Sequence, residues 1–168
     1  MHAMAIRLFA YGTLQLTQGE SRRLHAIAAV PGTVEGFGLY DSGLGWPFAA
    51  PAEGAGLVHG QILTLPGDRG SAEDVARAFL RADEWEDYDP TDPTRSLFVR
   101  ERVEATAGNG ARTEAHVYLS SAERLRRRYP GLRVTLIEGG IWCPGPDRPV
   151  TRRRPRPAPS SSRRTPDR

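Results

Sequence analysis

The sequence predicts an α+β protein built around a small, curled β-sheet or barrel. Strand-like segments run in clusters with only single helical segments between them, whereas a doubly wound sheet alternates strands and helices regularly. Two strand-like segments flank the turn at residues 108–110, Gly-Asn-Gly, which is typical of an antiparallel hairpin. Glycines recur at the strand breaks, which favours a sheet that curls on itself.

The first predicted element is a strand over residues 5–10, where apolar residues recur before the turn Tyr11-Gly12-Thr13-Leu14. A strand that ends on such a turn and leads toward a helix lets consecutive backbone N–H groups converge on a carboxylate or phosphate. Gly12 permits a positive φ and the close approach of a ligand. An ordinary turn produces the same pattern, so the turn alone does not identify a site.

The next elements are a short helix and three strand-like pieces. Residues 17–29 start with capping residues and continue with apolar residues at helical spacing, so we expect a helix that Pro31 ends. Residues 32–51 combine two short strand-like pieces with Gly and Pro at the turns. Residues 56–65 form a better strand, in which Gly60 indicates a bulge or close packing.

The second half of the chain begins with its clearest helix, over residues 71–89. Ser71 and Asp74 resemble a capping box at its start, and Pro90 closes it. The remaining segments are the two hairpin strands, a basic helical turn or two and a last strand, over residues 96–107, 111–120, 121–131 and 132–142. No internal repeat is present in the sequence.

The helix at 71–89 carries a candidate catalytic residue. At 100° per residue, Val75, Phe79, Ala82 and Glu86 fall within roughly 60° of one another, so Glu86 continues the apolar face. Burial raises the pKa of a carboxyl group toward neutrality, as general acid/base catalysis requires. The alternative is a frayed, solvated acidic helix end. We expect the other acidic residues to point to the flanks or to solvent: Asp83, Glu84 and Asp87.

The charge distribution divides the chain into a domain, residues 1–150, and a tail, residues 151–168. The tail holds seven Arg and one Asp, a net charge of +6, so residues 1–150 carry −3 of the total of +3. The tail is rich in Pro, Ser and Arg without apolar periodicity, so we expect it to be disordered. A solubilising role is favoured over nucleic-acid binding because the tail has no aromatic residue for base stacking.

The sequence lacks the motifs of several functional classes. The single cysteine, Cys143, excludes an internal disulfide, and the four His are too widely spaced for a ligand pair, so we expect no metal. Asp41 stands where a dinucleotide fingerprint from Gly36 needs glycine, and neither a P-loop nor GxSxG is present, so we expect no cofactor. Neither a signal peptide nor a membrane span is recognisable, which predicts a cytoplasmic protein.

Seven ordered segments resemble the γ-glutamylcyclotransferase-like (AIG2-like) superfamily, together covering about residues 5–142. Family members often read LDxxEGY where this chain has Ala in place of Leu, at Ala82, and Asp in place of Gly, at Asp87. The segments are FAYGTL (9–14), GTVEGFGLYDSGLGWPFAAP (32–51), GLVHGQILTL (56–65), ADEWEDYDP (82–90), FVRERVEA (98–105), AHVYL (115–119) and EGGIW (138–142).

The resemblance implies a small mixed β-barrel with flanking helices and a pocket for a γ-glutamyl group. By the family pattern, the loop Tyr11-Gly12-Thr13-Leu14 offers backbone donors to the α-carboxylate region of the substrate. Glu86 aligns with the catalytic glutamate, and Tyr118 with a pocket-lining tyrosine. The implied enzyme, of transferase or lyase type, releases 5-oxoproline and a free amine without a cofactor. A non-catalytic member that binds a small molecule in the same pocket is the alternative.

Two further groups of residues each have two possible roles. Trp46-Pro47-Phe48 either forms a wall of the pocket or belongs to the plain core. Arg100 and Arg102 are expected to pair with strand neighbours, although one of them could instead bind a substrate carboxylate. The oligomeric state does not follow from the sequence.

Overall fold

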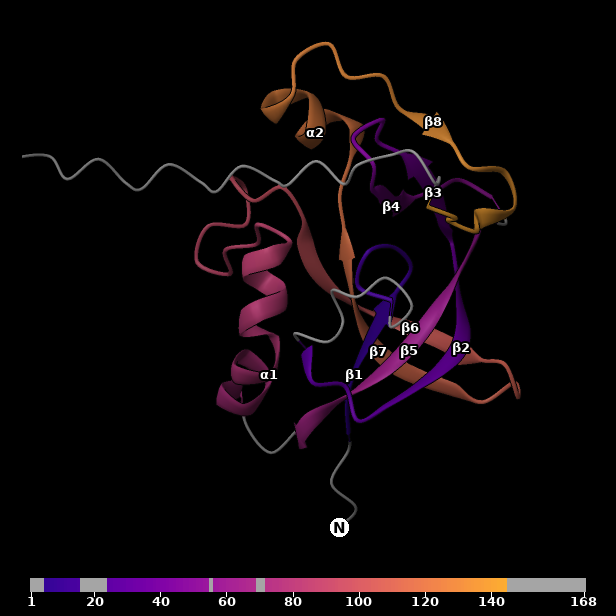
Figure 1. Cartoon of the computed structure of the whole chain (residues 1–168), viewed down its shortest axis with the longest axis vertical. Helices are drawn as coiled ribbons and strands as arrows, with labels where there is room; N and C mark the ends of the chain where they lie inside the picture. Colours follow the sequence, from indigo (N-terminus) through magenta and orange to yellow (C-terminus); the bar gives the residue numbers. More distant parts are fainter. Residues whose placement is uncertain (1–4, 16–23, 55, 69–71, 145–168) are drawn as a thin grey trace, which may run out of the picture.

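The computed structural model describes residues 5–15, 24–54, 56–68 and 72–144. Five strands close a barrel in the order β1-β5-β2-β6-β7, and a second sheet has the order β4-β3-β8. The elements are β1 (Ala5–Ala10), β2 (Ala28–Glu35), β3 (Phe37–Asp41), β4 (Pro47–Pro51), β5 (Leu57–Asp68), α1 (Ala72–Trp85), β6 (Val99–Ala107), β7 (Arg112–Leu119), α2 (Ala122–Arg128), β8 (Thr135–Leu136) and the 3-10 helix η3 (Glu138–Gly140). In Figure 1, α1 stands beside the barrel and the small sheet lies above it.

The barrel is mixed because its closing strand pair is parallel. β1 runs antiparallel to β5 from the pair Ile6↔Leu65 to the pair Ala10↔Gln61. β1 pairs with β7 in parallel, with Leu8 opposite His116. The α+β class and the small mixed barrel with flanking helices are therefore confirmed.

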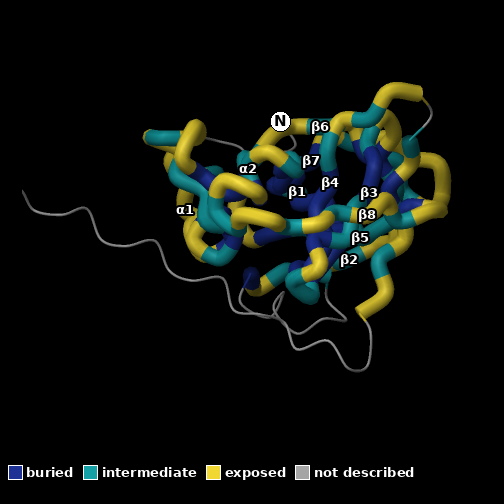
Figure 2. The backbone as a smooth tube through the Cα atoms, turned by 90° about the horizontal axis from the view of Figure 1, so that it is seen from above, coloured by how far each residue is buried: buried dark blue, intermediate teal, exposed yellow. Residues whose placement is uncertain are grey.

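The apolar core lies on both faces of the barrel strands, and buried segments run through the middle of the molecule in Figure 2. Ile6 and Leu8 of β1 are fully buried, and they share a hydrophobic cluster with Phe79 of α1. Phe9, the residue between Leu8 and Ala10, belongs to a second cluster with Val117 of β7. Successive side chains of β1 thus pack on opposite faces, and α1 covers one of these faces.

The hairpin and the basic helix are confirmed. β6 and β7 pair from Val99↔Leu119 to Thr106↔Arg112 and enclose the turn at 108–110. α2 begins at Ala122 after the N-cap Ser121, whose side chain accepts a hydrogen bond from the Arg124 N–H.

Two predictions of secondary structure are wrong. The helix predicted over 17–29 lies largely in residues 16–23, outside the described residues, but Ala28 and Ala29 belong to β2, and Pro31 lies inside that strand instead of ending a helix. Pairing of β2 with β5 along the whole of β2 outweighs the local helical spacing. The last strand, predicted over 132–142, is reduced to β8 and is followed by η3.

The predicted helix at 71–89 is observed as α1, which ends at Trp85, before Pro90. Ser71, half of the predicted capping box, and the tail at 151–168 lie outside the described residues. Among the described residues, none of the helices is both long and apolar enough to span a membrane. The described part of the chain also holds no group of three His, Cys, Asp or Glu side chains arranged to bind a metal ion.

Candidate active site

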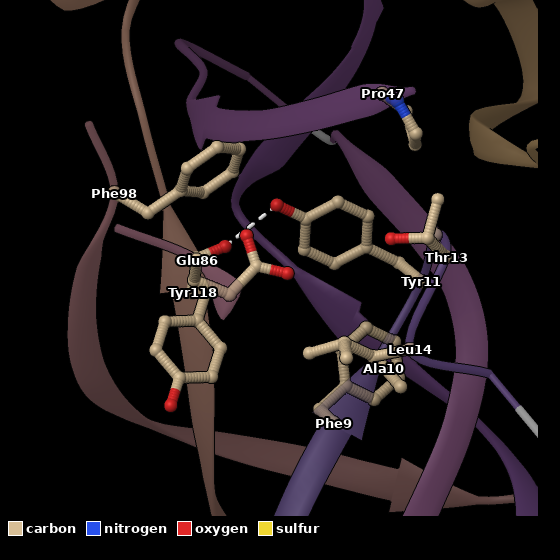
Figure 3. Close-up of a pocket in the computed structure, with 10 residues that line it drawn as sticks. Phe9, Ala10, Tyr11, Thr13, Leu14, Pro47, Glu86, Phe98 and Tyr118 are labelled. Carbon is tan, nitrogen blue, oxygen red and sulfur yellow. Dashed lines mark hydrogen bonds between the residues drawn. The ribbon is translucent and has the colours of Figure 1, made fainter. Parts of the chain in front are cut away.

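A pocket with an empty volume of about 290 Å³ opens at the end of β1, where the loop after this strand faces the end of α1 (Figure 3). The residues that sequence analysis assigned to the site all line this one pocket. The full lining is Phe9, Ala10, Tyr11, Gly12, Thr13, Leu14, Pro47, Glu86, Phe98 and Tyr118.

The loop side of the pocket is held by packing and by main-chain contacts. The Tyr11 hydroxyl donates a hydrogen bond to the Tyr118 carbonyl oxygen at 2.6 Å and accepts one from the Ala49 N–H at 3.1 Å. The N–H of Gln15 closes the turn on the Gly12 carbonyl oxygen at 3.1 Å. The Tyr11 side chain therefore ties this loop to β7 and β4.

Gly12 is required for a different reason from the predicted one. Its φ is not positive, so left-handed backbone does not explain the glycine. A Cβ at this position would lie 2.9 Å from Pro47 Cγ, closer than side chains pack. Gly12 therefore lets the loop approach β4. Gly60 acts in a similar way on the adjacent strand, since its Cβ would lie 2.3 Å from the Ala10 carbonyl oxygen, which confirms the close packing expected there.

The opposite side of the pocket is the C-terminal end of α1, which closes in a Schellman motif. The Tyr88 N–H bonds the Asp83 carbonyl oxygen at 2.8 Å, and the Asp87 N–H bonds the Glu84 carbonyl oxygen at 3.3 Å. Glu86 is the C-cap in this arrangement, and Asp87 has the left-handed φ of +52° that the next position requires. Glycine is the usual residue there.

Glu86 lies on the inward side of this helix end and is only 4% exposed. In Figure 3 its carboxyl group lies beside the Tyr11 ring, with Phe98 on the other side. The predicted helix face is confirmed, because Phe79 and Ala82 of the same face are fully buried. A buried carboxyl group at the wall of a small, mostly apolar pocket is poorly hydrated.

The prediction that Asp83 points to the flank or to solvent is wrong. Asp83 is 7% exposed, and its Oδ1 accepts a hydrogen bond from the Tyr118 hydroxyl at 2.5 Å. The same oxygen lies 3.1 Å from Nε of Arg100. Asp83 follows Phe79 by four residues, which places it within about 40° of that buried side chain on a helix. This spacing was the signal in the sequence.

Burial changes the protonation of this cluster. Desolvation raises the pKa of Asp83 to about 6, and the Tyr118 hydrogen bond and the Arg100 charge only partly oppose the shift. Desolvation also raises the pKa of Tyr118 well above its usual value, with further contributions from the Asp83 charge and hydrogen bond. Tyr118 is therefore a neutral phenol, and in Figure 3 its hydroxyl points away from the Glu86 carboxyl group.

Asp87 is also more enclosed than predicted, whereas Glu84 is exposed as expected. The Asp87 side chain is 17% exposed and forms an ion pair with Arg128 at the end of α2. Asp87 thus connects α1 to α2 directly after Glu86.

The remaining candidates divide between core and surface. Trp46 and Phe48 are core residues, 2% and 1% exposed, whereas Pro47 between them lines the pocket. Arg102 pairs with Glu114 on the neighbouring strand, as predicted, at 3.7 Å. Arg100 instead pairs with the helix residue Asp83. Cys143 is exposed and does not line the pocket.

Sequence analysis did not select the apolar lining residues Phe9, Ala10 and Phe98. Phe9 and Ala10 directly precede the turn, and Phe98 directly precedes β6, so their positions beside predicted features were the available signal.

Comparison with known families identifies this architecture. The sequence profile of the family described as "Gamma-glutamyl cyclotransferase, AIG2-like" matches residues 8–144, which contain the second half of β1, the turn at Tyr11, α1 and both hairpin strands. The chain belongs to this family. Among curated proteins, no sequence matches the chain.

Several solved structures share the fold. YkqA from Bacillus subtilis is 18% identical, with a TM-score of 0.55 over 83% of this chain and 40% of YkqA. At3g28950.1 from Arabidopsis thaliana is 19% identical, with a TM-score of 0.51 over 71% of this chain and 66% of that protein. An AIG2-like protein from Mus musculus is 24% identical, with a TM-score of 0.50 over 74% and 84% of the two chains. The chain thus spans less than half of YkqA.

Proposed function

We propose that this protein is a γ-glutamylcyclotransferase that converts a γ-glutamyl amide into 5-oxoproline and a free amine. One observation carries the proposal: the Glu86 carboxyl group and the Tyr11-Gly12-Thr13-Leu14 loop line the same small pocket. Membership of the AIG2-like family, over residues 8–144, supports a cyclotransferase type of enzyme. A small-molecule substrate is consistent with this family.

In the proposed reaction the substrate supplies its own nucleophile. Its α-amine nitrogen attacks the γ-carbonyl carbon, so that a new C–N bond closes the five-membered ring and the amide C–N bond to the leaving amine breaks. Glu86 takes a proton from the attacking amine and returns it to the leaving nitrogen, so it ends the cycle unchanged. Because the attack is intramolecular, the protein needs no Ser or Cys nucleophile.

The loop would hold the other end of the substrate. Backbone N–H groups between Tyr11 and Leu14 would donate hydrogen bonds to the α-carboxylate region, and a donor near the γ-carbonyl would stabilise the developing oxyanion. The ring of Tyr118 would form one wall beside Glu86. Its hydroxyl donates a hydrogen bond to Asp83 and would therefore not contact the substrate.

The alternative is a family member that binds a small molecule in this pocket without converting it. A buried, ionisable side chain such as Glu86 is costly to keep in an apolar wall and has an obvious use only if protons are transferred. This argument favours the enzyme. A cytoplasmic location stays a prediction.

The test is a panel of γ-glutamyl amides, assayed for 5-oxoproline release. The leaving amines should include an α-amino acid, a dipeptide, the ε-amine of lysine and a simple alkylamine. Glu86→Gln keeps the size of the side chain but cannot exchange a proton, so kcat should fall by about 10²–10⁴-fold. Glu84→Gln, an exposed carboxylate on the same helix, is the matched control and should keep wild-type activity.

Two results would contradict the enzyme. One is full activity of Glu86→Gln on a substrate that the wild type converts. The other is binding of γ-glutamyl amides by the wild type, measured by calorimetry, without release of 5-oxoproline from any of them; this result would establish the binding module instead.

A further inference from the structure

A buried polar cluster lies behind the pocket wall and shares one residue, Tyr118, with the pocket lining. It consists of Asp83 near the end of α1, Arg100 of β6 and Tyr118 of β7. A single oxygen, Asp83 Oδ1, receives both the Tyr118 hydroxyl at 2.5 Å and the Arg100 Nε at 3.1 Å. The Asp83 and Arg100 side chains are each 11% exposed.

Aromatic rings enclose the cluster and make it depend on Asp83. The Arg100 guanidinium carbon lies 4.2 Å from the Phe79 ring centroid and 5.7 Å from that of Tyr88. Within the described part of the chain, Arg100 Nη1 is buried without a hydrogen-bond partner. Asp83 is thus the group that compensates the buried guanidinium, and removing its charge leaves the guanidinium poorly compensated.

The cluster connects the two sides of the pocket through one residue, Tyr118. Its hydroxyl donates to Asp83, three residues before Glu86. Its carbonyl oxygen accepts the hydroxyl of Tyr11, the first residue of the opposite loop. The ring between these two contacts is part of the pocket wall. A change at Asp83 therefore acts directly on the helix end that carries Glu86 and on the Tyr118 side chain in the pocket wall.

The helix end needs such a connection. The last turn of α1 and the residues after it carry Asp83, Glu84, Glu86 and Asp87, and the last turn has no basic residue. Carboxylates at a helix C-terminus are unfavourable because the helix dipole is negative there. Two cations from other elements pair with these carboxylates: Arg100 of β6 with Asp83 and Arg128 of α2 with Asp87.

We propose that Asp83 is a positioning residue for Glu86: its carboxylate, anchored by Arg100 and bonded to the Tyr118 hydroxyl, fixes the helix end and the pocket wall that together aim Glu86 at the substrate. This inference rests on the proposed function of Glu86. It assigns Asp83 no contact with the substrate, because Asp83 does not line the pocket.

The proposal carries a pH dependence. Desolvation raises the pKa of Asp83 to about 6, so its anchoring charge is present above that pH and is lost below it. Titratable or charged groups from three parts of the fold pack around the cluster. They are Arg100 of β6, His116 and Tyr118 of β7, and Glu86 and Tyr88, which directly follow α1.

The kinetic test compares Asp83→Asn, Tyr118→Phe and their double variant with the control Glu84→Gln, all in the full chain. With a substrate that the wild type converts, each single variant should lose between about tenfold and a hundredfold in kcat, because small misplacements of a catalytic group have effects of this size. KM should change by less than about threefold. The kcat of the double variant should be no lower than that of the less active single variant, because the two residues act as a unit.

A second measurement does not depend on turnover. The side-chain carboxyl carbon of Glu86, assigned by its absence from the NMR spectrum of Glu86→Gln, should shift near pH 6 in the wild type as Asp83 takes up its proton. The shift should vanish in Asp83→Asn and persist in Glu84→Gln. Tyr118→Phe, which removes one oxygen and keeps the ring, provides the test if Asp83→Asn does not fold.

The outcomes separate the two proposals. A wild type that converts a substrate, together with unchanged kcat in folded Asp83→Asn or Tyr118→Phe, overturns the positioning role alone. An inactive wild type overturns the proposed function, and the NMR titration then decides whether Asp83 controls the surroundings of Glu86. Additive losses of kcat in the double variant also contradict the inference, since they would mean that Asp83 and Tyr118 act separately.

Discussion

The two sides of the pocket are held in place by different forces. The loop side, from Tyr11 to Leu14, depends on shape: Gly12 lies against Pro47, and the strand before the loop lies against Gly60. The helix side depends on charge. Asp83 pairs with Arg100 on β6, and Asp87 with Arg128 on α2.

This difference has a physical consequence. Packing contacts do not respond to protonation, whereas ion pairs respond to pH and, where they are exposed, to salt. The loop that would bind the substrate should therefore keep its geometry over a wide pH range, and the helix end that carries Glu86 should not. Each of the following predictions tests one side of this contrast.

The largest expected effect is the pH dependence of stability through Asp83. Its pKa is 3.8 in the unfolded chain and about 6 in the folded protein, so the folded state holds the proton more tightly. Between about pH 4 and 6 this group's contribution to the unfolding free energy therefore falls as the pH rises, by on the order of 3 kcal/mol. Asp83→Asn should lack this contribution. Urea unfolding at several pH values measures it.

The decisive quantity is the difference between the wild-type and Asp83→Asn unfolding free energies as a function of pH. This difference should fall between about pH 4 and 6, whatever its constant offset. Glu84→Gln should keep the wild-type slope. A difference that is flat over this range would mean that Asp83 is not desolvated in the folded state.

The second prediction concerns the loop side. In Gly12→Ala the new Cβ would lie 2.9 Å from Pro47 Cγ, so the loop or β4 must shift, with a loss of about 1–3 kcal/mol in unfolding free energy. KM for a γ-glutamyl amide should rise, because the loop donors move. The double variant Gly12→Ala, Pro47→Ala should recover much of the stability, since the clashing ring is gone.

Gly108→Ala is the matched control for this change. Its Cβ would meet only the Pro31 carbonyl oxygen, at 3.8 Å, an ordinary contact. We expect its unfolding free energy to stay within about 0.5 kcal/mol of wild type. Equal losses in Gly12→Ala and Gly108→Ala would show that the approach of the loop to Pro47 is not what requires the glycine.

The smallest effect is expected at Asp87, where a backbone cost and an ion pair oppose each other. Asp87→Gly removes the left-handed strain, roughly 1 kcal/mol, and loses the pair with Arg128. Asp87→Asn loses the pair but keeps most of the strain. Asp87→Gly should therefore be more stable than Asp87→Asn by about 1 kcal/mol in thermal unfolding.

The control is Arg127→Ala on α2, whose partner Glu123 is 84% exposed, so its loss should change stability by less than about 0.5 kcal/mol. If Asp87→Asn proved as stable as Asp87→Gly, the φ of +52° at this residue would carry no cost.

Local rules accounted for much of the candidate site. Glu86 was selected because it continues the apolar face of a helix, and such a face is set by residues three and four apart. The turn after β1 was selected from its position at a strand end. The same rules also placed Asp83 close to Phe79, but a charged residue was assigned to solvent because its compensating partner, Arg100, is on another element.

The failures share one cause. Ala28 and Ala29 belong to β2 instead of a helix because β2 pairs with β5. In this pairing Ala28 lies opposite Thr64, which is more than thirty residues later in the chain. Helical spacing is a preference of a few tenths of a kcal/mol per residue, and pairing along a whole strand outweighs it. No local pattern contains the partner strand.

The sequence by itself determined the α+β class, the barrel family and the identity of the carboxylate and the turn that line the pocket, because these depend on periodicity, turn residues and an ordered set of family segments. Only the tertiary structure decided that Asp83 is buried in contact with Arg100 and Tyr118. It also decided that residue 12 must be glycine because the loop packs against Pro47, and not because of the backbone conformation of Gly12. Both are contacts between segments far apart in the chain, and their energies exist only once the barrel has closed.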